Sequence, residues 1–234
     1  MKDKLSQLYN AGFDRLYGIS TQESPGTRTG QKSEVGDQAR YVPIDYIALM
    51  YLFAGIKFRP HDVFVDIGCG LGRAVLIAAR RRIRAAIGIE YDPVLARQAE
   101  GNKRTLRGAR ANIDIRKQDA ARADFDEGTI FWMYNPFGER TMSTVLDRLR
   151  LSLRTNPRDI LIVYAHPRLS RQVDQQHWLQ RAGERRFPTA GENGHAIYWS
   201  SKPIGAGADT VFGWIRSELS PATKGTTLKS GTDR

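Results

Sequence analysis

The stretch that decides the fold runs from Val63 to Ala79 and reads VFVDIGCGLGRAVLIAA. It opens with an apolar run typical of a buried strand, and it ends with an Ala-rich apolar run typical of a helix. Three glycines stand on alternate positions between the two runs, where glycine allows positive φ and a close approach of the backbone. This order predicts a strand, a tight turn and a helix N-terminus, an arrangement that points backbone N–H groups at a ligand.

The spacing of the glycines indicates which ligand this turn binds. A dinucleotide fingerprint reads Gly-x-Gly-x-x-Gly, but here the third glycine comes one residue early and Arg73 fills its place. Asp66, two positions before the first glycine, would repel a pyrophosphate and attract a cationic amino group. Glu90 ends a second apolar run at a position that suits a ribose diol. An amine and a ribose without a phosphate clamp favour S-adenosylmethionine, and a nicotinamide dehydrogenase stays as an alternative.

The motif Asp-x-Gly-x-Gly-x-Gly, followed by a strand-terminal Glu, resembles the class I S-adenosylmethionine-dependent methyltransferases. The resemblance implies a set of residues that contact the cofactor: Asp66, Gly68, Gly70, Gly72 and Glu90. In that family an acid after the third strand binds the exocyclic amine of adenine, and Asp119, followed by Ala120, occupies this place. An ordinary strand–helix turn, in which the glycines only make the corner, is the alternative.

The rest of the chain is consistent with a doubly wound, mostly parallel α/β sheet of seven strands with a short N-terminal helical extension. Helices are expected over 1–18, 41–53 with Pro43 in the first turn, 71–83, 92–107, 139–153 and 169–182. Strands are expected to end near residues 67, 90, 116, 134 and 165, and a closing hairpin is expected over 185–189 and 195–200. The predicted division is an extension over 1–40 that ends in a long loop, a cofactor-binding domain over 41–203, and a C-terminal extension over 204–234 whose end we expect to be disordered.

Polar residues stand at the predicted ends of four separate strands. They are Asp66, Glu90, Asp119 and Asn135. Ligands of such sheets bind beyond the carboxyl ends of the strands, so the four side chains are expected along one edge.

Methyltransferases that act on amines often carry Asn-Pro-Pro-Tyr or Asn-Pro-Pro-Phe where this chain has Asn135-Pro136-Phe137-Gly138. The resemblance implies that the Asn oxygen and the next carbonyl accept N–H bonds from the amine. The chain departs from the motif after the first proline, so a strand-ending turn with a core Phe remains an alternative. Our catalytic candidates are Asn135, Pro136, Phe137 and Tyr41, which lies at the junction between the long loop and the next helix. His166 follows the fifth strand and is expected at the same edge of the sheet, where it could act as a general base or have only a structural role.

A narrower resemblance covers most of residues 12–200. The segment from Phe58 to Gly68, together with the Asn-Pro-Phe-Gly turn, is similar to the Dot1-like histone-lysine methyltransferases. The segment Phe13 to Thr21 resembles bacterial proteins of unassigned substrate. No region matches the nucleosome-binding parts of Dot1, so histone specificity does not follow.

Composition narrows the function classes. The chain has 234 residues, a single cysteine and a net charge of +11. One cysteine excludes an internal disulfide framework, and no residue spacing indicates a metal site. The apolar runs are too short for a membrane span, and we expect a cytoplasmic protein with an amine acceptor on a protein or small molecule. The charge leaves a nucleic-acid methyltransferase open, against the interpretation of a generally basic, solvated surface. A non-catalytic cofactor-binding module is a further alternative.

Overall fold

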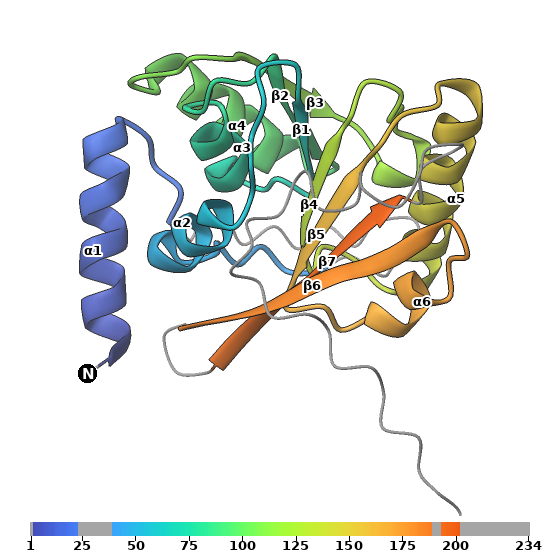
Figure 1. Ribbon diagram of the computed structural model, residues 1–234. Helices are drawn as coiled ribbons and strands as arrows, with labels where there is room; N and C mark the ends of the chain where they lie inside the picture. Colours follow the sequence, from blue (N-terminus) through green and yellow to red (C-terminus); the bar gives the residue numbers. More distant parts are fainter. Residues whose placement is uncertain (1, 23–38, 189–192, 202–234) are drawn as a thin grey trace, which may run out of the picture.

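The computed structural model describes residues 2–22, 39–188 and 193–201, and these form one layered α/β unit around a seven-stranded sheet (Figure 1). The strand order is β3-β2-β1-β4-β5-β7-β6. The first five strands run parallel, and β7 lies antiparallel between β5 and β6. The predicted fold class is therefore confirmed.

The strands are β1 Val63–Ile67, β2 Ala85–Glu90, β3 Asn112–Lys117, β4 Ile130–Tyr134, β5 Leu161–Ala165, β6 Leu179–Pro188 and β7 Asn193–Ser201. The helices are α1 Lys2–Tyr17, α2 Tyr46–Ala54, α3 Arg73–Ala78, α4 Pro93–Thr105, the 3₁₀ helix η2 Ala120–Arg122, α5 Glu139–Thr155 and α6 Ser170–Asp174.

Three elements differ from their predictions. The helix predicted over 71–83 ends at Ala78, because the backbone N–H groups of Arg80 and Arg81 donate to the carbonyls three residues before them and tighten the chain into a turn. The second helix begins at Tyr46 instead of near residue 41, because Asp45 is its N-cap and accepts a hydrogen bond from the backbone N–H of Ile47. Pro43 therefore precedes the helix. The helix predicted over 169–182 ends at Asp174, and β6 begins at Leu179, because the backbone from there onward pairs with β7. This pairing with the next strand overrides the local helical spacing. The loop residues 23–38 and the predicted extension 204–234 lie outside the described residues.

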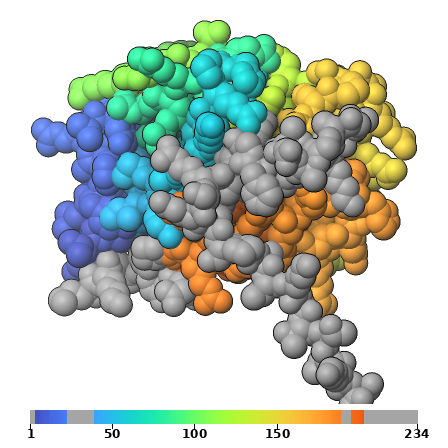
Figure 2. All heavy atoms as spheres, in the orientation of Figure 1, coloured from blue at the N-terminus to red at the C-terminus, as the bar shows by residue number. Residues whose placement is uncertain are grey.

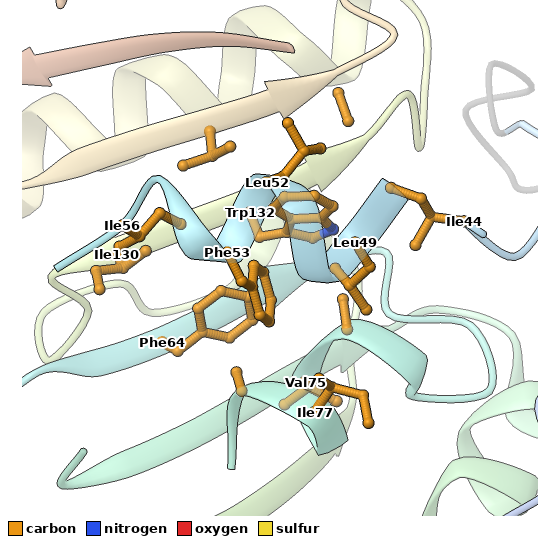
Figure 3. Close-up of a cluster of buried hydrophobic side chains, with 14 of the residues drawn as sticks. Ile44, Leu49, Leu52, Phe53, Ile56, Phe64, Val75, Ile77, Ile130 and Trp132 are labelled. Atoms are coloured by element: carbon orange, nitrogen blue, oxygen red, sulfur yellow. The ribbon is translucent and has the colours of Figure 1, made fainter. Parts of the chain in front are cut away.

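Apolar side chains cover both faces of the sheet. On one face, α2 and α3 contribute to a cluster in which the Phe53 ring meets the edges of Phe64 and Trp132, each with centroids 5.4 Å apart (Figure 3). On the other face, α5 packs its apolar stripe against β1, β4 and β5. Burial on both sides explains why the central strands are continuously apolar.

The N-terminal helix α1 is attached to the first face through aromatic rings. Phe13 and Tyr17 lie against Tyr46 of α2, with ring centroids 5.1 and 5.8 Å from that ring. In Figure 1, α1 stands beside α2 at the outer side of the molecule, and Figure 2 shows their surfaces in contact. The extension is thus packed on the domain that carries the glycine turn.

The parallel pairing aligns the carboxyl ends of β1, β2, β3 and β4. Asp66 is the register partner of Gly88 in β2 and of Trp132 in β4, and Glu90 is the partner of Lys117 in β3. This alignment forms the edge at which a ligand binds in doubly wound sheets. Within the described ranges, no helix is long and apolar enough to cross a bilayer.

Candidate functional site

The turn after β1 has the backbone shape that its glycines permit. Gly68, Gly70 and Gly72 have φ angles of 80°, 55° and 89°, all in the left-handed region. The N–H groups of Gly68 and Cys69 both donate to the carbonyl oxygen of Ile89, at 2.9 Å each. These bonds fasten the turn to the end of β2, so its shape is held by the neighbouring strand.

The two predicted acids lie close together around this turn. Asp66 is 2% exposed, and its Oδ2 accepts a hydrogen bond from the backbone N–H of Val75 at 3.2 Å. Glu90 joins the two turns at the site: its Oε2 accepts from Gly70 N–H at 2.7 Å, and its Oε1 accepts from Asp92 N–H at 2.8 Å. The carboxylate predicted to hold a ribose therefore also holds the glycine turn in place.

The electrostatics of these acids suit a positively charged ligand. Burial, with a smaller contribution from the charge of Glu90, raises the pKa of Asp66 to about 8. Burial likewise raises the pKa of Glu90. It also raises the pKa of the Cys69 thiol, to which the charges of Asp66 and Glu90 add. A buried pair of carboxyl groups favours a nearby cation, because a cation stabilises their charged forms. The carboxyl groups of Asp66 and Glu90 at this turn therefore fit a positively charged sulfonium nucleoside better than a phosphate, which they would repel.

Asp119 lies next to the end of β2. The backbone N–H of Gln118 donates to the carbonyl of Glu90 at 2.9 Å, which brings the segment after β3 beside that acid. The half-buried Asp119 caps η2 by accepting from the N–H of Ala121 at 2.9 Å, and Ala120 is the first residue of η2. The structure therefore brings Asp66, Glu90 and Asp119 to one edge.

The turn after β4 lies directly against the glycine turn. A Cβ on Gly68 would come within 2.5 Å of the Cβ of Pro136. Asn135 has a φ of 48°, which is uncommon for a residue other than glycine, and its Oδ1 accepts a hydrogen bond from the Tyr164 hydroxyl at 3.1 Å. The carbonyl of Pro136 accepts from Ala39 N–H at 3.0 Å. Phe137, in contrast, is buried in the α5 cluster, as the alternative interpretation of this motif expects.

Tyr41 covers the other side of the glycine turn. A Cβ added to Gly70 would overlap its ring, so only glycine leaves room for the tyrosine there. Its hydroxyl donates to the carbonyl of Thr21 at 2.8 Å, and burial raises the pKa of this phenol. The sequence placed Tyr41 at a loop–helix junction, whereas the structure places it before the start of α2 at Tyr46 and in contact with the glycine turn.

A buried polar network around Arg73 was not identified from the sequence. Arg73 is 3% exposed. Its Nε donates to Thr21 Oγ1 at 2.7 Å, and its Nη1 donates to the carbonyl of Ile44 at 2.5 Å. Asp14 completes the network by accepting from Thr21 N–H, from the Thr21 hydroxyl and from the Tyr46 hydroxyl, at 2.8, 2.7 and 2.6 Å. Two features of the sequence could have indicated this network: Arg73 at the position after the third glycine, and the segment Phe13 to Thr21. The structure shows that Arg73 and this segment form one hydrogen-bond network.

The histidines do not assemble a metal site. His166, with a φ of 49°, lies between the rings of Tyr134 and Phe187, with centroids 5.4 and 5.5 Å away. His61 and His177 are exposed elsewhere. In the part of the chain that the structure describes, no group of three or more His, Cys, Asp or Glu residues could hold a metal ion.

Solved structures of methyltransferases share this fold. The m1A22 tRNA methyltransferase of Bacillus subtilis matches with a TM-score of 0.50 and 15% identity, over 67% of this chain and 64% of that one. An RNA methyltransferase from Salinibacter ruber, in complex with S-adenosylhomocysteine, matches with a TM-score of 0.47 and 23% identity, over 72% of this chain and 98% of that one. A putative RNA methyltransferase from Pyrococcus horikoshii matches with a TM-score of 0.48 and 15% identity, over 88% and 98%. No curated protein matches the chain.

The described residues have the fold and strand order of class I S-adenosylmethionine-dependent methyltransferases. Residues 32–128 match the family model described as histone methylation protein DOT1. This match includes the glycine turn, Glu90 and Asp119, and it ends before Asn135.

Proposed function

We propose that this protein is an S-adenosylmethionine-dependent methyltransferase that methylates an amine, with Asn135 and Pro136 as the groups that orient the acceptor nitrogen. The observation that carries the proposal is the left-handed backbone at Asn135, whose amide oxygen is held by the Tyr164 hydroxyl directly beyond β4. Strained backbone at a strand end is typical of functional sites. We infer that this backbone presents two oxygens beside the glycine turn, the side-chain oxygen of Asn135 and the carbonyl oxygen of Pro136.

On the cofactor side, we assign Glu90 to the ribose hydroxyls, Asp119 to the adenine amine and ionised Asp66 to the positive end of the cofactor. Each Glu90 oxygen accepts one backbone N–H and retains further acceptor capacity, so the acid can hold the turn and a diol at once. Bound S-adenosylmethionine supplies an electrophilic methyl group through its sulfonium. The protein's remaining task is to place a nucleophile in line and to exclude water.

On the acceptor side, Asn135 and Pro136 bind the N–H groups of a neutral amine and leave its lone pair directed at the methyl group. Both oxygens already accept one hydrogen bond, from Tyr164 and from Ala39, and each can accept a second. An amine with two N–H groups satisfies both oxygens, whereas a hydroxyl satisfies only one. After transfer, the extra proton on the nitrogen leaves to solvent.

The family description supports a protein amine as the acceptor, because it names histone methylation. The match ends at residue 128, so the acceptor side rests on the geometry of Asn135 alone. A small-molecule amine satisfies the same two oxygens.

The test is transfer of a radiolabelled methyl group into a fractionated lysate, with the labelled product hydrolysed and identified. The proposal expects the label on an amine nitrogen. Tyr164→Phe should lower kcat by roughly 2- to 10-fold, the effect of one lost hydrogen bond, and leave S-adenosylhomocysteine affinity unchanged. Tyr198→Phe is the matched control, because it also removes a buried hydroxyl, one that bonds to the Leu52 carbonyl.

Label found on oxygen or carbon would refute the amine proposal. Equal kcat values for the two tyrosine variants would remove Tyr164 and Asn135 from the acceptor site. An intact protein that binds the cofactor and methylates no acceptor in the lysate would favour the non-catalytic module.

A further inference from the structure

Two short segments outside the methyl-transfer site carry an unusual concentration of positive charge. Residues 80–84 and 103–110 together contain eight basic residues and no acid, which we call the basic patch: Arg80, Arg81, Arg82, Arg84, Lys103, Arg104, Arg107 and Arg110. The two segments are separated in the sequence, where the net charge of +11 is compatible with a basic, solvated surface or with a nucleic-acid partner.

The fold brings the two segments side by side. Arg110 N–H donates to the carbonyl of Ala79 at 2.8 Å, and the Arg80 guanidinium donates to the carbonyl of Arg107. A Cβ on Gly108 would lie 2.6 Å from Nη1 of Arg80, so the chain passes close to that side chain. The patch follows the C-terminal ends of α3 and α4 and precedes β2 and β3, at the end of the sheet opposite Asp66 and Glu90.

Most of this charge faces solvent and is only partly compensated by acids. Arg82, Arg104, Arg107 and Arg110 are exposed. Glu127 forms an ion pair with Arg84 at 3.4 Å, and Glu100 forms one with Lys103 at 3.2 Å. The patch therefore keeps a large positive charge on a small area.

Helix dipoles account for only part of this arrangement. Cations stabilise the last turn of a helix, and the effect falls off beyond that turn. Helix α3 ends at Ala78 and α4 at Thr105, so Arg82, Arg84 and Arg110 lie past the helix ends. Like charges brought together repel one another, and a bound polyanion relieves that repulsion.

The N-terminal extension supports the patch from one side. The guanidinium of Arg80 lies over the Tyr17 ring, 4.4 Å from its centroid, and Arg107 N–H donates to the Tyr17 carbonyl at 2.8 Å. These contacts hold residues of both basic segments against the end of α1. The patch is thus part of the packed domain.

We propose that the basic patch binds the phosphodiester backbone of a nucleic acid. Seven of its eight cations are arginines, whose planar guanidinium groups match phosphate oxygens in a bidentate geometry. A run of regularly spaced phosphates also satisfies several cations at once, as a single small anion does not. Because the patch lies at the opposite end of the sheet from Asn135, it anchors the protein and does not select the methylated atom. The proposal is independent of the amine acceptor proposed above.

The test is binding of labelled single-stranded RNA and duplex DNA, measured by fluorescence anisotropy across a series of salt concentrations. The patch variant combines Arg82→Ser, Arg104→Ser and Arg110→Ser. The control variant combines Arg140→Ser, Arg150→Ser and Arg154→Ser on α5, where the three arginines are also exposed and the loss of charge is equal.

The proposal expects affinity that falls steeply with salt, with a slope of log affinity against log salt near −0.7 per phosphate on a single strand. Three lost contacts reduce the slope by about 2 and, near 150 mM salt, weaken binding by roughly 50-fold. The control variant should lose far less. Calorimetry with S-adenosylhomocysteine should give the wild-type affinity for both variants, which shows that the fold is intact.

Equal losses in the two variants would overturn the proposal, because net charge alone would then explain binding. Absent or salt-insensitive binding to both nucleic acids would overturn it as well. So would polyglutamate that competes as well as RNA, or stronger binding to vesicles of anionic lipid. RNA binding without DNA binding, or the reverse, would support the proposal and identify the kind of nucleic acid.

Discussion

Asp66 makes the affinity for a cationic cofactor depend on pH, and Asp66→Asn should remove that dependence. Burial and the neighbouring Glu90 raise the pKa of Asp66 to about 8, so the carboxyl is mostly protonated at pH 7 in the free protein. A sulfonium beside it stabilises the ionised form. Binding should therefore release a proton from Asp66 wherever the pH is below its pKa.

The magnitude follows from the fraction of Asp66 that is ionised. With a pKa near 8, this fraction rises about ninefold from pH 6 to pH 7 and about fivefold from pH 7 to pH 8, and then levels off. The part of the S-adenosylmethionine affinity that depends on Asp66 should therefore rise by roughly 50-fold from pH 6 to pH 8. Asp66→Asn keeps an acceptor for Val75 N–H and cannot ionise, so its affinity should lack this rise.

Isothermal titration calorimetry in two buffers of different ionisation enthalpy measures both the affinity and the number of protons released. The cofactor's own α-amino group also titrates near pH 8, so the difference between wild type and Asp66→Asn isolates the contribution of Asp66. We expect about one additional proton released by the wild type at pH 6 to 7 and none above pH 9. Identical proton release and identical pH profiles for the two proteins would refute the reasoning.

Further predictions concern stability. The pKa of Asp66 in the folded protein lies above its unfolded value of 3.8, so the stability that Asp66 contributes is lost as the pH rises from about 4 to 8. The Tm of Asp66→Asn should therefore vary less with pH over this range than the Tm of the wild type, and parallel curves of Tm against pH for the two proteins would contradict this. Gly70→Ala should destabilise the fold by about 1–3 kcal/mol in urea unfolding, because its φ is 55° and Tyr41 fills the space. Gly101→Ala, within α4 and with nothing within 4 Å of its Cβ, should be neutral or stabilising, and equal effects of the two changes would count against this reasoning. Arg73→Met should lower the free energy of unfolding by about 1–3 kcal/mol, because it leaves the buried Thr21 hydroxyl and the Ile44 carbonyl without the hydrogen bonds that Arg73 donates; a loss below about 0.5 kcal/mol would show that the network contributes little.

The sequence predicted the sheet well because its signals are local. The glycine turn, the apolar strand runs and the Asp92-Pro93 helix start depend on residues within a few positions of one another. The same locality explains the misplaced start of β6, whose strand character comes from pairing with β7. The sequence predicted this strand only from residue 185 onward, because nothing within residues 179–184 alone distinguishes a strand from a helix.

The acids at the strand ends could be placed from the sequence because parallel strands end at a common edge. The hydrogen bonds that connect the site to the rest of the protein could not be predicted from the sequence. The hydrogen bond from Gly70 to Glu90 spans 20 positions, and that from Tyr164 to Asn135 spans 29. The Arg73–Thr21 bond spans 52 positions and requires the segment after α1 to lie beside α3, which no local pattern predicts.

The central claim is that the turn after β1 and the acids at the ends of β1 and β2 hold S-adenosylmethionine. A crystal structure of the protein with S-adenosylhomocysteine tests it most directly. The account predicts ribose hydroxyls within hydrogen-bond distance of Glu90, the thioether above the glycine turn and Asn135 facing the vacant methyl position. A nucleoside bound at another edge of the sheet, or one that leaves Glu90 without a ribose contact, would contradict the claim.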